Sequence, residues 1–179
     1  NFEVSQGYKD VTDLSVIVKF PLKGEKDTYV LAWTTTPWTL PGNMALALGP
    51  KVKYVRVEVE QDGKKEYYIL AENLVDAVLG DRDYVAKDLL NAKDLEGKEY
   101  EPLFPFYKGK LEKKAYYIVL ADFVSTEDGT GVVHIAPAFG EDDLQIGHKY
   151  DLPILQHVEL NGEFKKEVKP WAGKFVKGQ

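Results

Sequence analysis

The chain has 179 residues, of which 44% are apolar, and its formal net charge is −6. This length suits one domain and this apolar share supports a packed core, so an intrinsically disordered chain is excluded. A protein that grips duplex nucleic acid over a long footprint is disfavoured, because neutralised phosphates supply most of the affinity of such proteins.

Short strands separated by turn residues dominate the sequence. The β-branched and aromatic runs at 15–20 and 28–33 predict two strands that are joined by the turn LKGEKD. The alternating run at 54–60 and the run at 66–70 flank a Gln-Asp-Gly turn, which predicts a β-hairpin. Further strands are expected at 116–121, 131–136 and 154–160.

Two helices are expected. The segment AENLVDAVLG at 71–80 places four apolar residues on one stripe and ends at Gly80, a residue type that commonly follows the last helical turn. The segment at 141–150 has acids in its first turn and has His148 and Lys149 in its last turn, as the helix dipole favours.

Because strands outnumber helices and the connections are short, we expect an α+β fold, a β-barrel-rich domain with a few peripheral helices. A single domain is expected to span 1–179, with 1–10 and 169–179 as extended connections to a parent protein. The only methionine is Met44, so the sequence resembles a piece of a longer protein. No signal-peptide pattern and no apolar run of roughly 20 residues is present. We therefore expect a cytoplasmic protein without a membrane partner.

The run WTTTPWTLPGN at 33–43 is too polar for a core strand and too rigid for a linker. Pro37 and Pro41 fix φ and remove backbone donors, so the residues before them avoid helical geometry. A strand that ends here would hold three threonine hydroxyls in fixed directions, where they could position a water or an ester oxygen. From this run alone, threonines selected only for strand propensity are an open alternative.

The stretch GTGVVHIAPAFGEDD at 129–143 predicts a strand, a stop and a helix start. His134 lies on the strand, and Pro137 ends it. Asp143 lies in the first helical turn, where backbone N–H groups and the helix dipole favour the ionised carboxylate. Two plainer interpretations stay open, in which Asp143 is a capping carboxylate and His134 is a hydrogen-bonded core histidine.

Other chemistries lack support in the sequence. There is no cysteine, which excludes thiolate metal sites and a cysteine nucleophile. The three histidines lack zinc-binding spacing, and neither a calcium loop nor a glycine-rich phosphate loop is present. We therefore expect no metal and no cofactor.

Together, the two motifs resemble the inserted editing domain of isoleucyl-tRNA synthetase, a class I enzyme, and the resemblance covers essentially the whole chain. Related valyl and leucyl editing domains carry an arginine in a TTRP peptide where this chain has Thr36, which favours the isoleucyl branch. The resemblance implies a β-barrel-rich module that hydrolyses valine wrongly attached to isoleucine tRNA. The implied partners are the acceptor end of that tRNA carrying valine and the remainder of the parent synthetase, and a monomer is expected. Signatures of the HIGH and KMSKS type are absent, so this piece is not expected to aminoacylate.

The resemblance also implies roles for the motif residues. As catalytic residues, Thr35 and Thr36 would line the pocket and help to place the attacking water, while Asp143 would pair with the α-ammonium of the substrate. His134 would bound the pocket for the amino-acid side chain. The remaining substrate-binding residues would be Thr34, Asn43, which supports the loop, and Trp38 and Thr39, which shape the pocket wall.

Two other functions stay open at this point. A valyl-type editing domain would reject threonine instead of valine. A non-catalytic module would only dock a tRNA end and would leave the ester intact.

Overall fold

The computed structural model describes residues 14–177, and its main feature is one sheet. Short helices connect the strands. The elements in chain order are β1 (Val16–Pro21), β2 (Thr28–Thr34), η2 (Pro37–Gly42), β3 (Ala45–Leu48), β4 (Lys53–Gln61), β5 (Lys64–Ala71), η3 (Glu72–Leu74), α1 (Val75–Leu79), β6 (Tyr84–Asn91), α2 (Ala92–Leu95), η4 (Pro105–Tyr107), β7 (Tyr117–Leu120), β8 (Val132–Ile135) and α3 (Glu141–Lys149), where η denotes a 3₁₀ helix.

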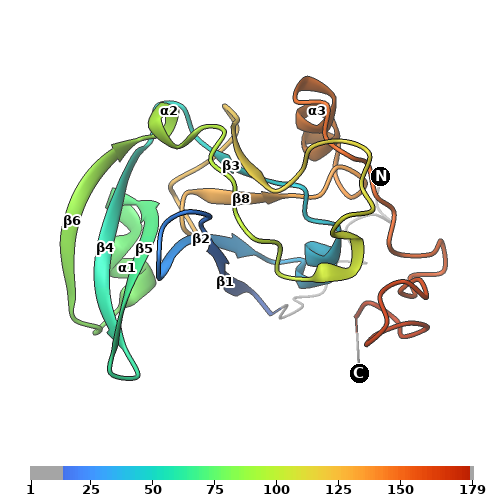
Figure 1. Ribbon diagram of the computed structural model, residues 1–179, viewed down its shortest axis with the longest axis horizontal. Coiled ribbons are helices and arrows are strands. Elements are labelled where there is room, and N and C mark those ends of the chain that lie inside the picture. Colours follow the sequence, from blue (N-terminus) through green and yellow to red (C-terminus); the bar gives the residue numbers. More distant parts are fainter. Residues whose placement is uncertain (1–13, 178–179) are drawn as a thin grey trace, which may run out of the picture.

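The sheet curls but stays open. Its strand order is β6-β4-β5-β2-β8-β3-β7, and β1 pairs with β2 outside this path. In Figure 1 the long strands β4, β5 and β6 form one side, whereas β3 and β8 lie beneath α3 on the other. Among the described residues β6 and β7 do not pair. The expected strand-rich α+β class with few helices is therefore confirmed, but the sheet is an open half-barrel and not a closed barrel.

The topology brings the two sequence motifs to the same edge. β2 pairs in parallel with β5 near its start and with β8 near its end, where Trp33 is opposite Val133. β8 is also antiparallel to β3, which places His134 opposite Leu46. Because β2 and β8 run in the same direction, the threonines that follow β2 and the loop that follows β8 leave the sheet side by side.

The predicted hairpins are confirmed. β1 pairs with β2, and β4 pairs with β5, both in antiparallel register. In the β4–β5 turn, Asp62 and Gly63 have φ values of 51° and 75°. Positive φ at both central residues is the geometry of a type I′ turn, which Asp-Gly sequences favour.

Two strands, β3 and β6, were not predicted from the sequence. β3 has only four residues, all buried, so the run is too short to show a period. β6 forms the edge of the sheet, and nearly all of its side chains are exposed, so it has no apolar alternation. Strand prediction from hydrophobic period fails for both, because one strand is buried on both faces and the other on neither.

Two other expectations were wrong in part or in full. Residues 154–160 form no strand and contribute only an isolated bridge between Val158 and Phe164. The apolar side chains of this segment do not share a sheet face: Ile154 and Leu160 are exposed, while Val158 packs into a separate aromatic cluster. The helix expected at 71–80 is shorter, because β5 continues to Ala71 and α1 begins only at Val75.

The expected extended ends are only partly described. Residues 1–10 lie outside the described residues. Residues 169–177 form turns with one bridge, between Phe175 and Glu163, so they are not the extended strand that we predicted. Aromatic side chains hold this part of the chain: Trp171 packs edge-on against Phe104 and Phe106.

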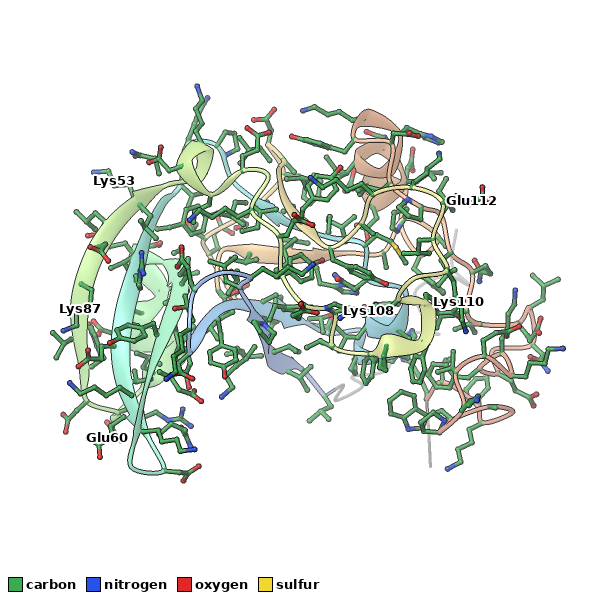
Figure 2. All side chains as sticks on the ribbon, viewed as in Figure 1. Lys53, Glu60, Lys87, Lys108, Lys110 and Glu112 are labelled. Carbon is green, nitrogen blue, oxygen red and sulfur yellow. The ribbon has the colours of Figure 1, made fainter. Side chains whose placement is uncertain are left out.

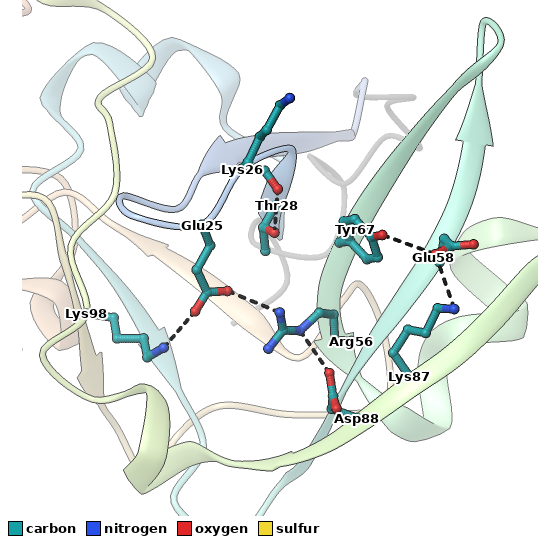
Figure 3. Close-up of polar contacts among 9 residues, drawn as sticks. All are labelled: Glu25, Lys26, Thr28, Arg56, Glu58, Tyr67, Lys87, Asp88 and Lys98. Carbon is teal, nitrogen blue, oxygen red and sulfur yellow. Dashed lines mark hydrogen bonds and ion pairs between the residues drawn. The ribbon is translucent and has the colours of Figure 1, made fainter.

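Ion pairs join the β1–β2 turn to β4 and β6. Arg56 on β4 lies 3.4 Å from Glu25 and 3.3 Å from Asp88 (Figure 3). Glu25 also pairs with Lys98, which precedes β7. A second group surrounds Glu58, which contacts three partners, Lys65, Lys87 and Tyr67. Such partly exposed pairs contribute little each. The first group links the turn to β4 and β6, and the second links β4 to β5 and β6.

Charged side chains of both signs project from the surface in Figure 2. On β4 and β6 the labelled positions are Lys53, Glu60 and Lys87, and after η4 they are Lys108, Lys110 and Glu112. Within residues 14–177, no helix combines the length and apolar character needed to span a bilayer. The same residues contain no group of three or more histidines and acids arranged to hold a metal ion.

Candidate active site

A pocket of about 290 Å³ opens where the two motifs meet. It is bounded by the end of β2, the start of η2, the strand β8 and the start of α3. Six of the eight residues proposed from the sequence line it: Thr34, Thr35, Thr36, Thr39, His134 and Asp143. The other lining residues are Trp33, Val133, Phe139 and Gly140.

The threonine loop is folded by its own hydroxyls. Thr34 is the last residue of β2 and is buried, and its Oγ1 accepts a hydrogen bond of 3.0 Å from the backbone N–H of Thr36. This local bond turns the chain out of the strand. Pro37 then starts η2, where its fixed φ suits the first helical position. As a result Thr35 and Thr36 are exposed at the pocket, and Thr39 is buried beneath them.

A line of hydroxyl contacts runs along the floor of the pocket. Thr39 Oγ1 donates to the carbonyl oxygen of Thr36 at 2.8 Å and lies 2.8 Å from His134 Nε2. Thr36 Oγ1 lies 3.2 Å from Thr39 Oγ1 and 3.3 Å from Thr34 Oγ1. Because each hydroxyl has one proton, these contacts constrain which lone pairs face the pocket.

His134 is a buried, neutral histidine in a fixed tautomer. Its side chain is 6% exposed, and burial, reinforced by nearby His157, lowers its pKa to about 3. Asn43 Nδ2 lies 2.9 Å from His134 Nδ1, and an amide nitrogen can only donate. Nδ1 is therefore the acceptor, and Nε2 carries the proton that it donates to Thr39.

Asn43 supports the pocket from behind. It is 4% exposed and does not line the pocket, but its Nδ2 also donates to the carbonyl oxygen of Ala45 at 2.9 Å. Its Oδ1 accepts a hydrogen bond from the hydroxyl of Tyr100. Asn43 thus joins the threonine loop to β8 through His134.

Asp143 links the start of α3 to the end of β8. Its Oδ2 accepts the backbone N–H of Ala136 at 2.9 Å, and among the described residues its Oδ1 has no hydrogen-bond partner. Burial raises the pKa of Asp143, although the Ala136 bond lowers it, and the neighbouring Asp142 adds to the rise. The position of Asp143 in the first helical turn predicted the opposite direction, because N–H groups and the dipole there favour a carboxylate. That part of the prediction was wrong, because desolvation outweighs the favourable hydrogen bond from Ala136.

Trp38 does not line this pocket. It lines a separate cavity of about 270 Å³, with Phe104, Trp171 and Lys174 among the other lining residues. Its carbonyl oxygen lies 2.8 Å from Nε2 of His157.

Trp33 and Phe139 line the pocket but were not proposed as site residues from the sequence. Both lie inside the two motifs. Trp33 is paired with Val133 across the junction of β2 and β8, a contact that no local sequence pattern shows.

The chain is similar in sequence to isoleucine–tRNA ligases. No family model matches the chain. The isoleucine–tRNA ligase of Clostridium novyi is 52% identical over 175 residues, which are 98% of this chain. The isoleucine–tRNA ligase of Picrophilus torridus is 48% identical over 176 residues, or 97% of this chain. The chain spans about 16% of the length of these relatives.

Solved structures share the fold. A crystal structure named GlLeuRS-CP1 aligns with a TM-score of 0.68 at 14% identity, covering 92% of this chain and 91% of that one. The editing domain of the Plasmodium knowlesi (P. knowlesi) cytosolic leucyl-tRNA synthetase aligns with a TM-score of 0.59 at 16% identity, covering 82% and 66%. The chain therefore corresponds, over nearly all of its length, to one segment of the isoleucine–tRNA ligases, and it has the fold of the leucyl-tRNA synthetase editing domains.

Proposed function

We propose that this chain is a post-transfer editing domain that hydrolyses valine wrongly esterified to isoleucine tRNA. The observation that carries the proposal is the pocket itself. Hydroxyls from the end of β2 and η2, a neutral histidine from β8 and a carboxylate from α3 converge there, in a chain that matches isoleucine–tRNA ligases. At about 290 Å³ the pocket suits an amino acid, since pockets for drug-sized ligands begin at roughly 300 Å³.

In this proposal the threonines position the nucleophile. Thr35 and Thr36 are exposed at the pocket, and the contacts of Thr36 with Thr34 and Thr39 fix the direction of its hydroxyl. A water held there attacks the ester carbonyl, the bond to the ribose oxygen breaks, and the products are free valine and the tRNA with its hydroxyl restored. Because the ester is already activated, positioning supplies much of the acceleration.

His134 is proposed as a wall and not as the general base. Both of its ring nitrogens are engaged, one as acceptor from Asn43 and one as donor to Thr39. With a pKa of about 3 it is also a weak proton acceptor. An efficient base has a pKa near the working pH, so the structure favours a steric role.

Asp143 is proposed to bind the α-ammonium group. Asp143 lines the pocket, its Oδ2 is held by Ala136, and its Oδ1 has no hydrogen-bond partner among the described residues. An ammonium beside this carboxylate would favour the ionised form and oppose the effect of burial on its pKa. Binding at this point fixes one end of the substrate and turns the ester toward the threonines.

The proposed substrate explains why a second site is needed. Valine is smaller than isoleucine by one methylene. A pocket that binds isoleucine can discriminate against valine by only about 1–3 kcal/mol, and isoleucine–tRNA ligases are the standard example of this limit. An editing pocket instead excludes the larger side chain with a rigid wall. His134, buried on β8 and bonded at both nitrogens, is rigid in this sense.

The proposed partners follow from the same reading. They are the acceptor end of isoleucine tRNA carrying valine and the remainder of a larger synthetase, and the proposal includes a cytoplasmic monomer. The net charge of −6 supports a contact limited to the tRNA end. The charged residues labelled in Figure 2 include both lysines and glutamates, so the charge on this surface is mixed.

The test is a deacylation assay with four substrates. The chain is incubated with isoleucine tRNA charged with valine or isoleucine, and with valine tRNA charged with threonine or valine. Editing of the isoleucyl type predicts release of valine from isoleucine tRNA and no release from the other three. Hydrolysis of threonyl-tRNA instead would indicate a valyl-type domain, and binding without hydrolysis would indicate a docking module.

A further inference from the structure

A buried polar chain continues behind the pocket to a residue outside both motifs. Tyr100 is fully buried, and its hydroxyl donates to Asn43 Oδ1. From Asn43 the contacts lead through His134 and Thr39 to Thr36 at the pocket surface. Tyr100 is therefore the inner end of the line of contacts that orients the threonine hydroxyls.

The surroundings hold Tyr100 in one position. Its backbone N–H donates to the carbonyl oxygen of Tyr116 at 2.9 Å, and the Tyr116 N–H donates to Met44 at 2.7 Å. Its ring packs edge-on against Phe20 with centroids 5.2 Å apart. Met44 directly follows Asn43 in the chain, so these contacts fix the tyrosine hydroxyl against the Asn43 amide.

The direction of each proton along the line is determined. Asn43 Oδ1 has no hydrogen, so the Tyr100 hydroxyl is the donor. The two amide hydrogens of Asn43 then go to Ala45 O and His134 Nδ1. Burial raises the pKa of Tyr100 well above its ordinary value, so its hydroxyl keeps the proton that it donates.

We propose that Tyr100 is a positioning residue for the ester hydrolysis, acting by fixing the Asn43 amide so that His134 keeps its Nε2–H tautomer. That tautomer makes Thr39 the acceptor, which directs the Thr39 proton to the Thr36 carbonyl and the Thr36 proton to Thr39. A lone pair of Thr36 is thereby presented to the pocket in a fixed direction. The inference rests on the proposed function for its kinetic consequence and on geometry alone for the tautomer.

Removing the hydroxyl leaves a defined defect. Tyr100→Phe keeps the ring but deprives buried Asn43 Oδ1 of its donor, and an unsatisfied buried acceptor is unfavourable. The Asn43 side chain is expected to rotate toward another donor and weaken its bond to His134. His134 can then exchange between tautomers, and Thr36 loses its fixed direction.

Two measurements test the proposal. The ring-nitrogen ¹⁵N shifts of His134 in the intact chain report its tautomer without any tRNA. We expect the wild type to show protonated Nε2 and unprotonated Nδ1, and Tyr100→Phe to show averaged shifts. For deacylation of isoleucine tRNA charged with valine, kcat should fall about 10-fold with little change in KM, because substrate contacts remain and only positioning is lost.

Tyr54→Phe is the matched control. Tyr54 is also a fully buried tyrosine whose hydroxyl makes two hydrogen bonds, with Gly49 and Gly131, but it is not part of the line to the pocket. It should lower the melting temperature and leave both the His134 shifts and kcat within about twofold of wild type. Equal kinetic losses in the two tyrosine variants would reduce Tyr100 to general stability and overturn the proposal.

The variant Asn43→Leu tests whether Tyr100 acts through Asn43. Asn43→Leu removes the link, so adding Tyr100→Phe should cause no further loss in kcat; additive losses would contradict the proposal. If Tyr100→Phe does not fold, Asn43→Leu alone must give the same averaged shifts. Unchanged His134 shifts in either folded variant would refute the tautomer claim. A wild-type chain without deacylase activity would instead refute the proposed function and leave the tautomer test standing.

Discussion

Replacing Asp143 by asparagine separates the charge of this residue from its shape. The amide is nearly the same size as the carboxylate, and its oxygen can still accept the Ala136 N–H that Oδ2 accepts at 2.9 Å. What is lost is the negative charge facing the pocket. Hydrogen bonds to charged groups contribute about 1.5–3 kcal/mol. Because about 1.4 kcal/mol corresponds to a tenfold change in rate, hydrolysis of isoleucine tRNA charged with valine should fall by about 10- to 150-fold.

Stability should not follow activity in this variant. Burial raises the pKa of Asp143, which means that folding disfavours its ionised form. A raised carboxyl pKa costs stability above the pKa of the unfolded chain, and the cost disappears as the pH falls below that value. Asparagine removes this cost, so at pH 7 the variant should be at least as stable as the wild type. Asp143→Ala should be less stable than Asp143→Asn, because it also loses the bond to Ala136.

The assay is single-turnover release of valine, together with thermal unfolding at pH 7. Asp142→Asn is the matched control, because Asp142 is an exposed acid in the same helical turn and does not line the pocket. It should keep the wild-type rate. A folded Asp143→Asn variant that hydrolyses valyl-tRNA at the wild-type rate would refute the role of this charge.

Three further predictions follow from the same geometry. His134→Ala should still hydrolyse isoleucine tRNA charged with valine and should begin to hydrolyse the same tRNA charged with isoleucine. The reason is that overpacking by one methylene costs about 1–3 kcal/mol, and this variant removes the wall that causes it. A folded variant that leaves the isoleucine ester intact would show that His134 does not exclude isoleucine. Gly42→Ala should lower the free energy of unfolding by about 1–3 kcal/mol, because the added Cβ would lie 2.7 Å from His157 Nδ1, a loss that urea denaturation would measure. The affinity for tRNA should depend weakly on salt, because the slope scales with the number of phosphates neutralised, and a slope typical of a duplex-binding protein would contradict a contact limited to the tRNA end.

Much of the site could be predicted because its residues lie in two continuous motifs. Thr35 and Thr36 directly follow a recognisable strand that ends at Thr34, and His134 and Asp143 flank a proline stop at the start of a helix. The chemistry of hydroxyls, an imidazole and a carboxylate limits what such a pocket can do. Neither motif shows that the strands before them are adjacent and parallel, which is a consequence of the sheet order and not of local sequence.

The parts that sequence reasoning missed depend on contacts between distant residues. Tyr100 has no local pattern that marks it, and its role comes from a hydrogen bond to Asn43, 57 positions away in the chain. His157 was expected on a strand, but it is buried against Trp38, far from it in sequence. The direction of the Asp143 pKa shift was misjudged because a one-dimensional pattern contains the dipole of a helix but not the burial of its side chains.

In the proposed function, this pocket hydrolyses the smaller aminoacyl ester and excludes the larger one. The most direct measurement is the ratio of single-turnover deacylation rates for one preparation of isoleucine tRNA charged either with valine or with isoleucine. A rigid wall that rejects one methylene at a cost of about 1–3 kcal/mol predicts a ratio of about 5 to 150 in favour of valine. Equal rates for the two esters, or no hydrolysis of either by the folded chain, would contradict it.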